Sequence, residues 1–140
     1  MNKPATCSHG IGAPGYSETW PCEPQSAGRA RALVGTALSV WGLKCLADRA
    51  TLVVSELVTN SVLHTRCRLV RVGIVRPDKE LVCITVSDRS TVRPAIRTPD
   101  EEWEAGRGLM LVEAMADRWE VDVRRWGKIV RVDLRVTAEG

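Results

Sequence analysis

Hydrophobic residues recur at helical spacing in two segments of the first half of the chain. From Ser26 onward one helical face is apolar, and Gly42 follows it where a helix would end. The apolar positions of this first predicted helix are Ala30, Leu33, Val34, Ala37, Leu38 and Trp41. A second segment, from about Leu46 or Asp48 to Thr65, is apolar on most of its surface. It predicts a helix that is largely buried.

The second half of the chain alternates between apolar and polar residues, as half-buried strands do. Four strands are expected there, at 68–75, 81–87, 119–125 and 128–136. The turn-like residues 76–79 would join the first two, and Trp126-Gly127 the last two. A short strand is also expected at 17–22, and a third helix at 109–117.

These elements predict one domain. Strands with antiparallel character and helices between them are typical of an α+β two-layer sandwich, with helices on one face of a mixed, mainly antiparallel sheet. Residues 1–16 contain three glycines and two prolines and predict a flexible leader, 17–136 form the domain, and 137–140 are a tail. The irregular stretch 88–108 is long for a loop in a compact domain, which favours a functional lid.

Composition narrows the class of protein. Of the 140 residues, 44% are hydrophobic and 26% are charged, as in a globular protein. The net charge of +3 is mild and its basic residues are interleaved with acidic ones, so direct nucleic-acid binding is not expected. No apolar run is long enough to span a membrane or to form a signal peptide. We expect a cytoplasmic protein.

The five cysteines are odd in number and contain no C-x-x-C pair. We expect reduced structural thiols, with Cys67 and Cys83 filling small apolar positions in strands. Because His9 and His64 are the only histidines, no zinc site is expected.

The second predicted helix carries a polar stripe. Glu56, Asn60 and His64 stand four residues apart and share one face of an otherwise apolar helix. They line a polar site or bond to one another and to nearby backbone. In a site, the Asn60 carbonyl could be one oxygen ligand of Mg²⁺ and Glu56 could orient or deprotonate a nucleophile. His64 is near the helix end, where a supporting role is expected.

Two further features follow in the chain. Asp88, at the end of a predicted strand, could accept a hydrogen bond from the exocyclic amine of a nucleobase, or could form a turn. Gly106-Arg107-Gly108-Leu109 opens the third helix, where unpaired N–H groups attract phosphate. Alone, each fits an ordinary turn; the order of all three features favours a nucleotide site.

With this order of motifs, the chain resembles the GHKL ATPases, which include DNA gyrase, heat-shock chaperones, histidine kinases and mismatch-repair ATPases. Glu56-Leu-Val-Thr-Asn60-Ser-Val-Leu-His64 looks like the N box of that family, Asp88 like the aspartate of its G1 box, and Gly106-Arg-Gly-Leu109 like its G2 box. The sequence of this N box is most similar to that of the anti-sigma-factor serine kinases of bacteria and of short ATP-binding regulators of actinomycetes.

The resemblance implies a Bergerat-type sandwich that binds ATP and Mg²⁺. It implies that Asn60 ligates the metal, Glu56 is the general base and Asp88 binds the adenine amine. The backbone of Gly106, Gly108 and Leu109 would meet the phosphates, with Arg107 as a possible neighbour. The G1 box normally reads Asp-x-Gly-x-Gly, whereas Asp88-Arg-Ser-Thr-Val92 has no glycine, so weaker or altered nucleotide binding is expected.

The resemblance leaves two function classes open. The first is a serine/threonine kinase that binds a sigma factor or other transcription regulator and phosphorylates a serine on an antagonist protein. The second is a non-catalytic protein-binding module with weak or lost nucleotide binding. Relatives of this kind often form homodimers.

Overall fold

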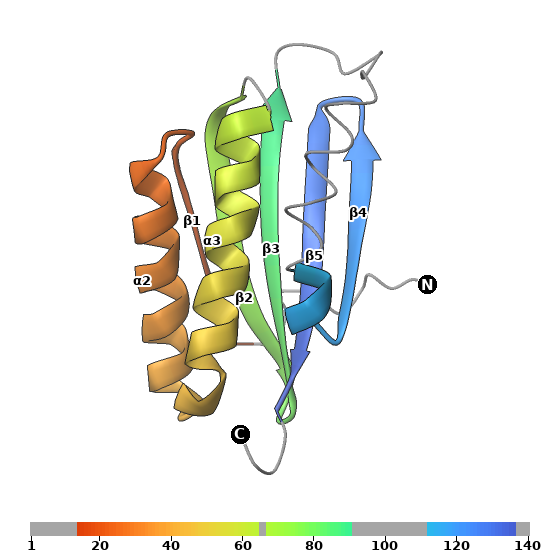
Figure 1. Cartoon of the computed structure of the whole chain (residues 1–140). Helices are drawn as coiled ribbons and strands as arrows, with labels where there is room; N and C mark the ends of the chain where they lie inside the picture. Colours follow the sequence, from red (N-terminus) through yellow and green to blue (C-terminus); the bar gives the residue numbers. More distant parts are fainter. Residues whose placement is uncertain (1–13, 65–66, 91–111, 137–140) are drawn as a thin grey trace.

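The computed structural model describes residues 14–64, 67–90 and 112–136. In chain order its elements are β1 (Gly15–Pro21), α2 (Gln25–Val40), the 3₁₀ helix η1 (Lys44–Leu46), α3 (Ala47–His64), β2 (Cys67–Asp78), β3 (Leu81–Ser90), β4 (Arg118–Arg124) and β5 (Gly127–Arg135) (Figure 1). A short helical stretch at 112–115 precedes β4.

The five strands form one sheet in the order β1-β2-β3-β5-β4. Every neighbouring pair is antiparallel, so the described sheet is antiparallel throughout instead of mixed. Helices α2 and α3 lie side by side over one face of the sheet (Figure 1). We call the opposite face the outer face. The predicted α+β two-layer architecture is confirmed.

The core lies between the helices and the sheet. Alternate residues of the central strands point toward the helices, as the period of two requires. The buried core includes Val34 and Leu38 of α2, Val53, Val54, Leu57 and Val58 of α3, Val70, Val72 and Ile74 of β2, Val82, Ile84 and Val86 of β3, and Val130, Val132 and Leu134 of β5. All six of the apolar positions predicted for the first helix lie in this core or pack against it.

Helix α2 ends as its sequence predicts. Gly42 adopts a left-handed φ of 72°, which a side chain would disfavour. Its N–H donates to the Ser39 carbonyl at 3.1 Å, and the next N–H, of Leu43, donates to the Leu38 carbonyl at 2.8 Å. These two bonds define a Schellman motif, with buried Leu43 and Leu38 as its apolar contact.

Strands β2 and β3 are longer than predicted. β2 continues to Asp78, and the turn between the strands falls at Lys79-Glu80. The Asp78 carboxylate accepts a hydrogen bond from the Glu80 N–H at 2.8 Å, which closes the turn locally. Tertiary pairing extends the ladder past Pro77, with an irregularity between Val75 and Asp78.

Two of the cysteines are not reduced thiols. Cys22 and Cys83 are disulfide-bonded, whereas Cys45 is free and exposed. The expectation of reduced thiols is therefore wrong for Cys22 and Cys83. Cys83 is buried in a strand, as expected. Among the described helices, none has the length and hydropathy needed to cross a membrane.

Candidate functional site

The Asp88 carboxylate lies between β3 and α3. The alternation of β3 that buries Val82, Ile84 and Val86 also turns Asp88 toward the helices, where it is 3% exposed. Ser61 of α3, itself 2% exposed, donates a hydrogen bond from Oγ to Asp88 Oδ2 at 2.8 Å. Asp88 was expected at the end of its strand, but β3 continues to Ser90. The carboxylate is therefore an interior group attached to α3.

The backbone of Asp88 is held from both sides. It pairs with Val70 of β2 and with Lys128 of β5. Gly127, with a φ of 153°, begins β5 so close to this point that a Cβ atom would overlap the Asp88 carbonyl oxygen. A glycine at this position thus lets the β4–β5 turn approach β3, and it leaves Asp88 little freedom to move.

Glu56 and Asn60 are half-buried on α3. In the part of the chain that the structure describes, neither side chain makes a hydrogen bond or an ion pair. The alternative in which the stripe satisfies itself with private hydrogen bonds is thus absent there. Half-buried polar side chains that make no hydrogen bond or ion pair within the described residues are suited to bind a ligand.

The direction in which Glu56 and Asn60 point follows from helix geometry. Arg49 stands seven and eleven residues before them and therefore shares their flank of α3. Its guanidinium donates to the carbonyls of Met115 at 3.2 Å and Arg135 at 3.1 Å. The flank thus faces the stretch 112–115 and β5, on the side away from α2 (Figure 1).

Other predicted site residues are not tested. Gly106, Arg107, Gly108 and Leu109 lie outside the described residues, and of His64 the structure describes the backbone alone. The structure therefore brings Asp88 against the helix that carries Glu56 and Asn60, while a phosphate-binding role for the glycine pair stays a prediction.

Ser61 is a site residue that the sequence interpretation missed. It falls on the buried stripe of α3, in line with Ala50, Val54 and Leu57. A polar residue at a core position needs a hydrogen-bond partner, which was the available signal. The partner could not be identified without the fold, because it stands 27 residues later in the chain.

Comparison with known proteins identifies the family of the domain. The protein-family model of the histidine kinase-like ATPase domain matches residues 20–134, which is nearly the whole described fold. A comparison with curated proteins gives no match. The match begins at Trp20, near the end of β1, and ends at Leu134 in β5, so it includes α3, Asp88 and the whole of β2, β3 and β4. The chain therefore belongs to the histidine kinase-like ATPase domain family.

Proposed function

We propose that this chain binds Mg·ATP beside α3 and acts as a serine/threonine kinase of the anti-sigma type. It would phosphorylate a serine on an antagonist protein, sequester a sigma factor or other transcription regulator, or do both. The observation that carries the proposal is the buried Asp88 carboxylate, which accepts a hydrogen bond from Ser61, the residue that follows Asn60 in α3. The family match supports an ATP-binding regulatory function.

The groups beside α3 have chemistry that suits ATP. A carboxylate between a strand and a helix can accept a hydrogen bond from the exocyclic amine of adenine, which is the role proposed for Asp88. Mg²⁺ binds oxygen ligands and often takes only one or two from protein, so the amide oxygen of Asn60 is a suitable ligand. When bound, the metal would neutralise phosphate charge.

Glu56, one helical turn before Asn60, is the proposed general base. It would accept the proton of a partner's serine hydroxyl while the serine oxygen bonds to the γ-phosphorus and the bond to the ADP oxygen breaks. Since Glu56 is half-buried and makes no described hydrogen bond or ion pair, its carboxylate is available for this role.

The alternative is a protein-binding module without catalysis, and one observation favours it. The G1 box of relatives has glycine two residues after the aspartate, whereas here that position is Ser90. β3 stays paired through Ser90, which lies opposite Cys67 of β2. An extended strand with a side chain at this point would reshape the adenine end of the site and weaken nucleotide binding.

Titration with ATP and Mg²⁺ tests the proposal. We expect wild-type protein to bind, and Asn60→Ala and Asp88→Asn to bind at least about tenfold more weakly, the equivalent of roughly 1.4 kcal/mol. Glu18→Gln is a matched control, because Glu18 is exposed on β1. If wild-type protein does not bind ATP at millimolar concentration, both the kinase role and ATP-dependent sequestration of a regulator are excluded.

Phosphoryl transfer distinguishes the two alternatives. Labelled ATP is incubated with the protein and a candidate antagonist. Label on an antagonist serine supports the kinase, and a stable complex without label supports the module. Glu56→Gln should keep ATP affinity and lose transfer. If Glu56→Gln transfers phosphate at the wild-type rate, the general-base assignment is wrong.

A further inference from the structure

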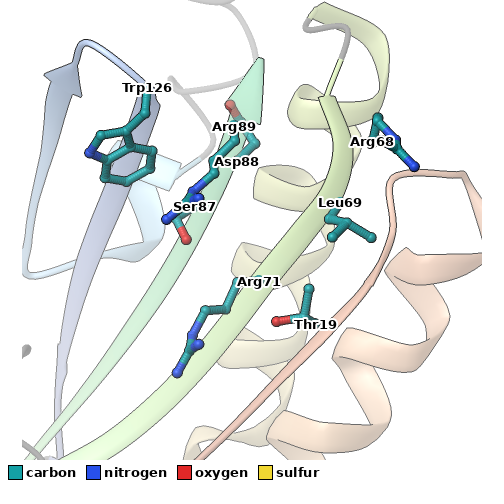
Figure 2. Close-up of a pocket in the computed structure, with 8 residues that line it drawn as sticks. All are labelled: Thr19, Arg68, Leu69, Arg71, Ser87, Asp88, Arg89 and Trp126. Carbon is teal, nitrogen blue, oxygen red and sulfur yellow. The ribbon is translucent and has the colours of Figure 1, made fainter. Parts of the chain in front are cut away.

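A hollow of about 560 Å³ opens on the outer face of the sheet, opposite the helices (Figure 2). Three arginines, Arg68, Arg71 and Arg89, line it together with Leu69, Trp126, Thr19, Ser87 and Asp88. We call it the arginine hollow. It shares Asp88 with the α3 site, but the Asp88 carboxylate is buried and accepts a hydrogen bond from Ser61 of α3.

Strand pairing builds the arginine hollow. Thr19, Arg71 and Ser87 stand opposite one another on β1, β2 and β3, so their side chains form one row across the outer face. Arg89 follows Ser87 on the same face. Beside them, the register of β2 shifts between Cys67 and Val70, at the position of Arg68. Such irregularities redirect side chains.

Trp126 closes one side of the arginine hollow. The Arg89 guanidinium lies over its indole ring, 5.3 Å from the ring centroid. This contact depends on Gly127, whose lack of a side chain allows the β4–β5 turn to approach β3. The turn thereby places a large aromatic side chain next to a cation.

The arginines of the hollow have no carboxylate partners. Within the described ranges, none of Arg68, Arg71 and Arg89 makes an ion pair; Arg71 donates only to Ser17 Oγ at 3.1 Å. Some other described arginines do form ion pairs, such as Arg29 with Glu23 at 3.0 Å and Arg124 with Asp122 at 2.7 Å. Three unpaired guanidinium groups around one hollow attract an anion.

Apolar surface accompanies the positive charge. Leu69 is 54% exposed and Trp126 is 37% exposed at the edge of the arginine hollow. An inorganic anion would leave this surface in water. A peptide with carboxylates and an apolar side chain would cover both kinds of surface.

The positive surface is also bounded. Ser87 of β3 pairs with Ile129 of β5, and Ile129 pairs in turn with Asp122 of β4. Asp122 therefore lies on the same face of the sheet as the hollow. Glu120 and Asp122 both approach Arg131, at 3.4 and 3.6 Å. A nucleic-acid backbone that extended beyond the hollow would meet these carboxylates, so a short acidic segment fits better.

We infer that the arginine hollow binds an acidic segment of a partner protein. Carboxylates of the segment pair with Arg71 and Arg89, and an apolar side chain packs on Leu69 and Trp126. Arg68 adds charge at the rim. The inference does not rest on the proposed kinase function, because binding of the segment needs no nucleotide.

Fluorescence anisotropy with a labelled ten-residue peptide, six residues of which are Asp or Glu around a central Leu, tests the inference without ATP. An analogue with Asn and Gln should bind at least about tenfold more weakly. Arg71→Gln should weaken binding about threefold and the double variant Arg71→Gln/Arg89→Gln about tenfold, as expected for exposed ion pairs. Added salt should weaken binding further.

Arg31→Gln is the matched control. Arg31 is also exposed and donates to a serine hydroxyl, that of Ser55, at 3.0 Å, but it lies on α2. The affinity of the Arg31→Gln variant for the peptide should be within about twofold of that of wild type. Equal weakening in Arg31→Gln and Arg71→Gln, no binding by wild-type protein, or tighter binding of single-stranded DNA or tripolyphosphate than of the peptide would overturn the inference.

Amide chemical shifts of the wild-type protein provide a test that does not depend on folding of the variants. Addition of the peptide should shift residues 68–71 and 87–89 and the β4–β5 turn. Shifts centred on α2 or α3 instead would overturn the inference.

Discussion

Ser61 Oγ donates to Asp88 Oδ2 across the interface between α3 and β3, at 2.8 Å, and both residues are almost fully buried. This bond fixes the helix that carries Glu56 and Asn60 to the strand that carries the carboxylate. The arrangement of the candidate site thus depends on Ser61, a residue for which no catalytic role is proposed. Disturbing it should affect stability and nucleotide binding together.

Ser61→Ala tests this bond. The variant leaves the buried carboxylate without one of its hydrogen-bond donors, which should lower the free energy of unfolding by about 1–3 kcal/mol. Urea denaturation measures the change. Ser55→Ala is the control, because the Ser55 hydroxyl bonds to Arg31 at an exposed position. A loss in Ser61→Ala no larger than in Ser55→Ala would show that the buried bond contributes little.

Two glycines of the α2 region should respond oppositely to alanine. Gly42→Ala forces a side chain into a left-handed conformation and should cost about 1 kcal/mol. Gly35 lies within α2, and a Cβ atom there would meet nothing within 4 Å. Gly35→Ala should therefore stabilise the protein by about 0.5–1 kcal/mol. Thermal unfolding of both variants gives the comparison, and equal signs would contradict it.

Gly127→Ala should be more damaging than Gly42→Ala. At Gly127 the added methyl group overlaps the Asp88 backbone, which cannot rotate away as a flexible side chain can. We expect the free energy of unfolding to fall by about 2 kcal/mol or more, because the overlap with the Asp88 backbone adds to the cost of a φ that alanine rarely adopts. Chemical denaturation of the two variants measures the difference. A smaller loss than in Gly42→Ala would mean that β3 and the turn separate easily.

Asp133 and Asp122 should give opposite pH effects. Burial raises the pKa of Asp133 above its ordinary value of 3.8, despite the nearby Arg118. As pH rises through 3.8 the unfolded chain ionises first, so the folded state loses stability up to the raised pKa. At pH 7 the free energy of unfolding of Asp133→Asn should exceed that of wild type, by less than about 1 kcal/mol because the group is only half-buried. Near pH 3 the two proteins should be equally stable.

For Asp122 the sign is reversed. The hydrogen bond from Arg124 lowers the pKa of Asp122, so its contribution is present above the ordinary 3.8 and is lost as pH falls through the lowered value. Asp122→Asn should be less stable than wild type at pH 7, with the difference disappearing in acid. Melting temperatures of both variants between pH 3 and pH 7 test the pair, and curves parallel to wild type would contradict both assignments.

Much of the fold follows from local pattern. The helices were predicted to within a few residues, because their apolar faces repeat at helical spacing, and Gly42 ends α2 because no other residue adopts its φ as readily. The strand ends were less accurate. β3 continues past Asp88 because Ser90 still pairs with Cys67 of β2, and such pairing is not visible in a local pattern.

The candidate site divides in the same way. The sequence by itself determined that Glu56 and Asn60 share a helical face and that Asp88 follows the apolar residues of a strand, because both statements depend only on the periodicity of the backbone. Tertiary structure decided that Asp88 faces α3, that Ser61 is its partner and that three arginines surround one hollow on the outer face. These relationships join residues that are distant in the chain, and only the packing of helices on a paired sheet brings them together.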